Sequence, residues 1–166
     1  MKLAKRFFLA SPLVLQTAVW PVVRPLLWFF CHLSVDGLEN LKNLPAGVIF
    51  TANHTSELDP IFLPASLPFL SRFMPMFYVS RPRSFYKTSG WRQFFYGRFL
   101  FKLWGAHPAI SGYRDYGLSL ALHIQVIRCR KSLFIFPEGR KTIDGKVMVE
   151  NAKGGAAFLA DRKSVV

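Results

Sequence analysis

The chain has 166 residues, which is the size of one domain and enough to bury a substantial apolar core. It combines a formal net charge of +13 with 51% hydrophobic and 16% aromatic residues, a mixture unlike the polar basic tails that bind nucleic acids. A chain that is both cationic and apolar suits an anionic membrane surface, where each Lys or Arg near the headgroups contributes about 1 kcal/mol.

The first 33 residues form a hydrophobic segment that we expect to associate with a membrane. Its apolar run, Phe7–Phe30, is long enough to cross a bilayer core of about 30 Å at about 1.5 Å per residue. Four residues interrupt the run: Pro12, Pro21, Arg24 and Pro25. We expect a break between Pro21 and Pro25, because a Pro inside a helix costs about 3 kcal/mol. Positive charge also lies on both sides of the run, which opposes a single crossing. A kinked or hairpin insertion into one leaflet meets both objections, while a crossing helix and a cleaved signal peptide remain alternatives.

The remaining residues alternate between expected strands and expected helices. Strands are expected near Leu33–Val35, Val48–Thr51, Met76–Val79 and Ser132–Phe136. Helices are expected near Pro60–Leu67, Trp91–Leu103, Leu118–Arg128 and Gly154–Ala160. This alternation predicts an α/β fold with a layered sheet flanked by helices. The cysteines, Cys31 and Cys129, have no metal-like spacing, and we expect both to be buried free thiols.

His54 and Asp59 stand five positions apart on the loop that should follow the strand near Val48–Thr51. A loop allows the carboxylate to fold back onto the imidazole. A carboxylate on one ring nitrogen fixes the tautomer and leaves the other nitrogen free to take a proton from a hydroxyl. His54 and Asp59 are therefore candidate catalytic residues, although four histidines and nine acidic residues can place one such pair by chance. The other histidines lack a comparable acidic partner and are expected to serve structure: His32, His107 and His123.

A second polar cluster follows the expected strand near Ser132–Phe136. It places a carboxylate, a glycine and two cations in succession: Glu138, Gly139, Arg140 and Lys141. Open α/β sheets bind ligands beyond the carboxyl ends of their strands. Two adjacent cations suit an anionic head group such as phosphate. The alternative is an ordinary turn with exposed charges.

These two motifs, in this order, resemble the glycerolipid acyltransferase family, of the lysophosphatidic-acid acyltransferase type. That family carries His-x4-Asp after a strand and a later Phe-Pro-Glu-Gly block, here Phe136–Gly139. Asp36–Leu41 and Lys153–Ala157 extend the resemblance, which covers about residue 34 to the end. Most members that form phosphatidic acid read Glu-Gly-Thr-Arg. The run Phe136–Arg140, followed by Gly145 and Met148, is more similar to bacterial 2-acylglycerophosphoethanolamine acyltransferases.

The resemblance implies a glycerol-3-phosphate acyltransferase-like fold for residues 34–166, and we expect this domain to lack its C-terminal part. It implies that the chain moves a fatty acyl chain to the free hydroxyl of 1-acylglycerol-3-phosphate or lysophosphatidylethanolamine. The donor would be acyl-CoA or an acyl carrier protein, with no further cofactor and no metal. The implied substrate-binding residues are Glu138, Gly139, Arg140 and, in the family's middle block, Arg114.

The resemblance further implies membrane phospholipids as partners, no nucleic acid, and a place on the cytoplasmic face of a membrane such as the bacterial inner membrane. No Ser or Cys is placed as a nucleophile, so we expect direct transfer without an acyl-enzyme. Two alternatives are a non-catalytic, decayed membrane-associated homologue and a basic nucleic-acid-binding module.

Overall fold

The computed structural model of the protein describes residues 2–81, 99–110, 115–142 and 152–164. Four strands form one parallel sheet in the order β1-β4-β2-β3. The strands are β1 (Ile49–Thr51), β2 (Met76–Ser80), β3 (Ala106–Pro108) and β4 (Ser132–Ile135). The helices are α1 (Lys2–Cys31), the short 3-10 helix η1 (Leu38–Leu41), α2 (Asp59–Ser66), α3 (Phe99–Trp104), α4 (Tyr116–Ser119), α5 (Ala121–Arg128) and α6 (Gly155–Ser164).

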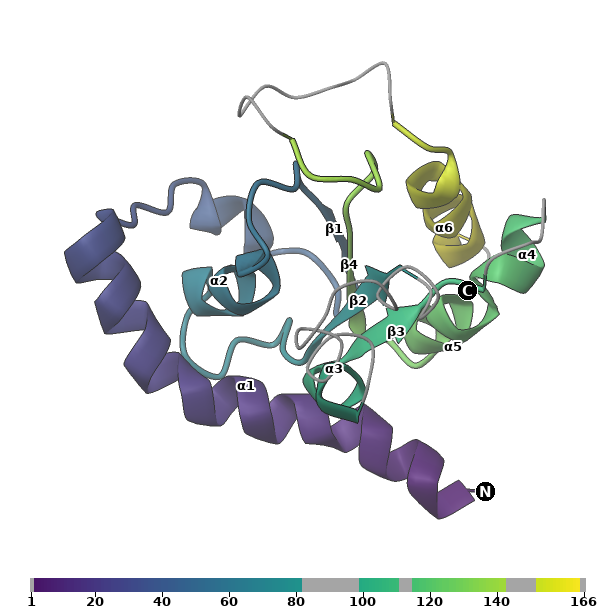
Figure 1. Cartoon of the computed structure of the whole chain (residues 1–166), viewed down its shortest axis with the longest axis horizontal. Coiled ribbons are helices and arrows are strands. Elements are labelled where there is room, and N and C mark those ends of the chain that lie inside the picture. Colours follow the sequence, from purple (N-terminus) through teal and green to yellow (C-terminus); the bar gives the residue numbers. More distant parts are fainter. Residues whose placement is uncertain (1, 82–98, 111–114, 143–151, 165–166) are drawn as a thin grey trace, which may run out of the picture.

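Helices cover both faces of the sheet, so the predicted α/β fold with a layered sheet flanked by helices is confirmed (Figure 1). α2 lies on one side with α1 and α3, and α5 and α6 lie on the other. The central strands β2 and β4 each contain a continuous apolar run, which suits strands whose two faces are both covered by helices. In β4, Leu133 and Ile135 face the core under α5 and α6, while Phe134 faces the core on the α2 side.

α1 is one continuous helix, so the break expected between Pro21 and Pro25 is wrong. The helix runs past α2 and α3 (Figure 1) and is fastened to them by polar side chains. Gln16 is almost fully buried; it donates to the carbonyls of Met76 (2.8 Å) and Trp104 (3.0 Å) and accepts from the Met76 N–H (2.9 Å). Packing of this kind stabilises a helix that local propensity disfavours.

Two further side chains extend this attachment toward the end of α1. The Trp20 indole donates to the Leu67 carbonyl at 2.9 Å, and Arg24 Nη1 donates to the Ala65 and Ser66 carbonyls at 2.8 Å each. These carbonyls lie at the C-terminal end of α2, where helix carbonyls lack partners within the helix. α1 therefore supplies hydrogen-bond donors that this end of α2 needs.

Other expectations need correction. Leu33–Val35 forms no strand, and β3, which was not expected, pairs with β2 at the edge of the sheet. The helix expected near Leu118–Arg128 is divided into α4 and α5. Both cysteines are free but exposed, since Cys31 ends α1 and Cys129 follows α5. Most of the expected helix Trp91–Leu103 lies outside the described residues.

Candidate active site

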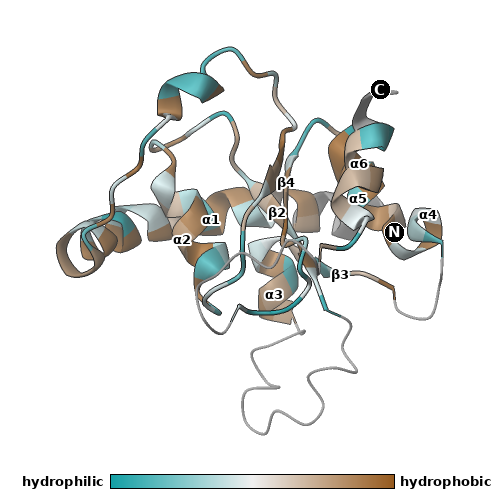
Figure 2. Cartoon of the chain, turned by 90° about the horizontal axis from the view of Figure 1, so that it is seen from above, coloured by the Kyte–Doolittle hydropathy of each residue, from teal (hydrophilic) through white to brown (hydrophobic). Residues whose placement is uncertain are grey.

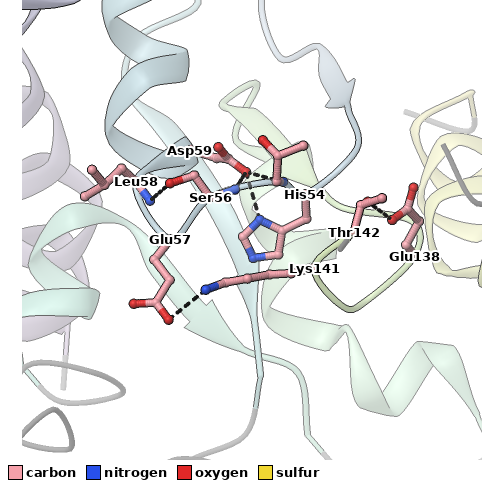
Figure 3. A network of polar contacts seen from close by, with 9 residues as sticks. His54, Ser56, Glu57, Leu58, Asp59, Glu138, Lys141 and Thr142 are labelled. Carbon is pink, nitrogen blue, oxygen red and sulfur yellow. Dashed lines mark hydrogen bonds and ion pairs between the residues drawn. The ribbon is translucent and has the colours of Figure 1, made fainter. Parts of the chain in front are cut away.

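His54 and Asp59 form a hydrogen bond between Nδ1 and Oδ2 at 2.9 Å (Figure 3). Asp59 is the first residue of α2, and the loop between β1 and α2 turns so that its side chain contacts the residues that follow β1. The same Oδ2 accepts from the backbone N–H groups of Thr55 (2.9 Å) and Ser56 (3.0 Å), which fixes the carboxylate in place. Because Nδ1 donates to the carboxylate, Nε2 is the nitrogen that can take a proton. The predicted contact is present, and the catalytic role of the two residues remains a prediction.

The loop after β4 packs directly against His54. The Phe136 ring stacks on the imidazole with 4.2 Å between ring centroids and an interplanar angle of 23°. The Thr142 backbone N–H donates to the His54 carbonyl at 2.7 Å. The two sequence motifs therefore meet because β1 and β4 are neighbouring parallel strands and both loops leave the same edge of the sheet.

Glu138 and Gly139 shape this loop from within. Glu138 is buried and accepts from the Thr142 hydroxyl at 2.8 Å, on the side of Thr142 away from the His54 ring (Figure 3). Gly139 has φ +63°, and its N–H donates to the Phe136 carbonyl at 3.0 Å. The Lys153 side chain lies 3.4–3.6 Å from where a Cβ on Gly139 would stand. Arg140, in contrast, is exposed.

Arg81 belongs to the site although it was not among the expected residues. It follows β2 and donates through Nε (3.0 Å) and Nη2 (2.5 Å) to the Gly139 carbonyl. β2 neighbours β4 in the sheet, so the end of β2 lies beside the Glu138 loop. The one sequence signal was its position directly after an apolar strand, where α/β sheets place ligand-binding groups.

Glu57 and Lys141 form an ion pair between the two loops, with Oε1 and Nζ 2.7 Å apart. Their side chains are 31% and 42% exposed, respectively, so the pair lies at the surface of the site. Lys141 was recognised as one of two adjacent cations, but its partner was not, because Glu57 lies in the other motif. The arrangement places the His54 imidazole beside a loop that carries two cations, Arg140 and Lys141.

The family model described as Acyltransferase matches residues 32–166. The chain belongs to the acyltransferase family. No curated protein and no solved structure matches it significantly. In this acyltransferase, the matched region includes both motifs and the four strands of the described residues, and it begins where α1 ends. The family indicates acyl transfer, and the geometry of His54, Asp59 and the Glu138 loop can be compared with the needs of that reaction.

The remaining expected site residue of the acyltransferase, Arg114, lies outside the described residues. Within the described part of the chain, no group of three or more His, Cys, Asp or Glu side chains is arranged to hold a metal ion.

Two other histidines are buried on the far side of the sheet from α2, where His123 is in hydrogen-bond contact with the His107 carbonyl at 3.1 Å. Burial lowers the pKa of both His107 and His123 to about 4, and for His107 the charges of His123 and Lys102 add to the effect. Both are neutral near pH 7, so neither carries a charge that could assist catalysis there. Their packing is in keeping with the structural role expected for them.

Proposed function

We propose that this acyltransferase is a membrane-associated O-acyltransferase that moves a fatty acyl chain to the free hydroxyl of a lysophospholipid. The donor is acyl-CoA or an acyl carrier protein, and the acceptor is 1-acylglycerol-3-phosphate or lysophosphatidylethanolamine. The observation that carries this proposal is the placement of the His54–Asp59 pair against the cationic loop Glu138–Lys141. A base beside an anion-binding loop fits an acceptor that carries a hydroxyl close to a phosphate.

In the proposed mechanism, Nε2 of His54 takes the proton from the acceptor hydroxyl as the hydroxyl oxygen attacks the thioester carbonyl. Asp59 holds the ring in the required tautomer and stabilises the imidazolium that forms. The C–S bond then breaks, and the departing thiolate receives the proton from His54. A positioned base of this kind contributes about 10²–10⁴-fold to the rate. The acyl group passes directly from the donor to the acceptor in a ternary complex of enzyme, donor and acceptor.

The acceptor head group is proposed to lie at the loop after β4. Arg140 is exposed there and supplies positive charge, and Arg114 is retained as a second proposed contact. Glu138 and Gly139 contribute through the loop itself, because the buried carboxylate holds Thr142 and the glycine allows the tight turn. Arg81 supports the same turn through the Gly139 carbonyl.

α1 is proposed to attach the enzyme to the membrane. Phe8–Cys31 is long and apolar enough to cross a bilayer by length and composition, and Figure 2 shows apolar residues along the helix. Its exposed apolar side chains include Leu13, Val14, Val22, Leu26, Trp28, Phe29 and Phe30. Because Gln16 and Arg24 fasten one face of the helix to the domain, we favour a helix that lies in one leaflet with its exposed apolar side chains in lipid.

The proposed activity is tested with purified membranes that contain the protein, a labelled acyl donor and a panel of acceptors. The panel consists of glycerol-3-phosphate, 1-acylglycerol-3-phosphate and lysophosphatidylethanolamine. We expect transfer to at least one lysophospholipid and a loss of about 100-fold or more in His54→Ala. The exposed His32 provides the matched control, His32→Ala, which should retain activity. Undiminished transfer by His54→Ala would remove His54 from the mechanism, and transfer to glycerol-3-phosphate alone would refute the acceptor class.

The membrane attachment is tested by flotation with anionic phospholipid vesicles. Phe29 and Phe30 are 66% and 71% exposed, and burying such a side chain contributes about 1.5–3 kcal/mol. Phe29→Ser/Phe30→Ser should therefore weaken vesicle binding by about tenfold or more. Leu118→Ser is the control, because Leu118 is 52% exposed but lies on α4, away from α1. Equal binding of both variants and the unmodified protein would refute this attachment.

A further inference from the structure

The ion pair between Glu57 and Lys141 lies on the side of the His54 ring from which an acceptor hydroxyl has to approach. In Figure 3, Nδ1 of the ring points to Asp59, while Nε2 points to the opposite side, where the Lys141 side chain extends toward Glu57. An acceptor bound with its hydroxyl at Nε2 therefore brings its head group close to both charges.

The backbone places the residues that carry these two charges beside His54. Glu57 stands in the turn between His54 and Asp59, and Lys141 stands directly before Thr142, whose N–H donates to the His54 carbonyl. The backbone of both residues is thus held near His54 independently of the ion pair itself. When the pair opens, both side chains remain anchored next to the loops that carry His54 and Thr142.

Charged groups of a ligand can also replace the ion pair at little cost in stability. Both side chains are about one-third exposed or more, and pairs with such access to water contribute little net stability. A ligand that offers one negative and one positive group can replace the internal pair without leaving either charge unpaired. Lys141 carries a compact ammonium group that binds phosphate as a point charge, and Glu57 can accept hydrogen bonds from a ligand ammonium.

We propose that Glu57 and Lys141 select acceptors whose head group carries both a phosphate and an ammonium group, as phosphoethanolamine does. This inference rests on the proposed function and narrows its acceptor class. The acceptor phosphate takes the place of Glu57 on Lys141, and the acceptor ammonium takes the place of Lys141 on Glu57. A phosphomonoester, as in 1-acylglycerol-3-phosphate, would satisfy Lys141 but leave the Glu57 carboxylate beside a further negative charge. Such juxtaposed like charges discriminate against a ligand.

The experiment compares kcat/KM for lysophosphatidylethanolamine and 1-acylglycerol-3-phosphate with one acyl donor in mixed micelles. The unmodified enzyme should prefer lysophosphatidylethanolamine. Glu57→Gln should shift the ratio of the two kcat/KM values by about tenfold or more toward 1-acylglycerol-3-phosphate, because it removes the repulsion and the ammonium partner together. Lys141→Gln should lower kcat/KM for both acceptors, since both carry a phosphate. Glu39→Gln, at an exposed glutamate on η1, is the matched control and should leave the ratio unchanged.

The outcomes separate this inference from the proposed function. Transfer to neither acceptor by the unmodified enzyme would overturn both. Transfer with an unchanged acceptor ratio in Glu57→Gln would overturn the selectivity alone, as would a preference of the unmodified enzyme for 1-acylglycerol-3-phosphate. Thermal unfolding of each variant confirms that it is folded, and Glu57→Thr provides a second neutral variant at the same surface position with the same expected shift.

Discussion

The backbone N–H of Thr142 donates a hydrogen bond to the His54 carbonyl at 2.7 Å. This contact joins the loop after β1 to the loop after β4 through main-chain atoms. Substituting the side chains around it leaves the two loops connected. Changes in activity of such variants therefore report on the chemistry and local geometry of the site.

Asp59→Asn should lower kcat by about 100-fold or more. The amide oxygen can still accept from the N–H groups of Thr55 and Ser56, so the turn is retained. The same oxygen also accepts from His54 Nδ1, so the ring keeps its orientation, but a neutral amide no longer stabilises the imidazolium that forms when His54 takes the proton. Steady-state kinetics with saturating donor measure the effect. Asp36→Asn, at an exposed aspartate, should retain activity, and full activity of Asp59→Asn would contradict the role of the Asp59 charge in stabilising the imidazolium.

Arg81→Met should raise KM for the acceptor and lower kcat/KM by about tenfold or more, because a small displacement of a positioning loop is costly. The substitution removes the two donors that hold the Gly139 carbonyl. Arg81→Lys should recover part of the loss, since one ammonium can replace one of the two bonds. KM for the acyl donor is the internal reference, and Arg128→Met, at an exposed position of α5, is the matched control. If Arg81→Met had normal acceptor kinetics, Arg81 would have no positioning role.

Gln16→Leu should lower the free energy of unfolding by about 3 kcal/mol, since each buried polar group left without a partner costs about 1–3 kcal/mol. The groups affected are the N–H and carbonyl of Met76 and the carbonyl of Trp104. Chemical denaturation in detergent, followed by tryptophan fluorescence, measures the change. Val14→Ala on the exposed face of α1 should have little effect. Equal stabilities of the two variants would show that Gln16 does not fasten α1.

The buried histidines predict a loss of stability in mild acid. Burial lowers the pKa of His107 and His123 from 6.5 to about 4, so the unfolded chain binds more protons between these values. Their contribution is fully present above pH 6.5 and falls as the pH decreases, by about 2 kcal/mol per histidine at pH 5. Unfolding at pH 7 and pH 5 tests this expectation. His123→Gln should flatten the dependence, whereas His32→Gln, at an exposed histidine, should not; an equal slope in both would contradict the prediction.

Local patterns were sufficient for several parts of the structure. β1, β2 and β4 were predicted because each contains a continuous apolar run. The His54–Asp59 contact was predicted because both residues belong to one short loop, where few conformations have to be considered. In each case the physical cause acts within a few residues of the sequence.

Prediction failed where partners are distant along the chain. Pro21 and Pro25 disfavour a helix locally, yet α1 continues through them because its side chains bind to α2, β2 and α3. β3 has only three residues, which are too few for a periodic pattern. It forms a strand because its backbone pairs with β2. Leu33–Val35 has the composition of a strand but no pairing in the sheet.

The sequence by itself determined that this protein is a basic, apolar α/β chain with a histidine–aspartate pair and a cationic turn at the ends of two strands. Only the tertiary structure decided that Arg81 supports Gly139 and that Glu57 pairs with Lys141. Both contacts follow from the strand order β1-β4-β2-β3, which places β4 between the strands that precede His54 and Arg81. Strand order depends on pairing between distant segments, and local residue patterns do not specify it.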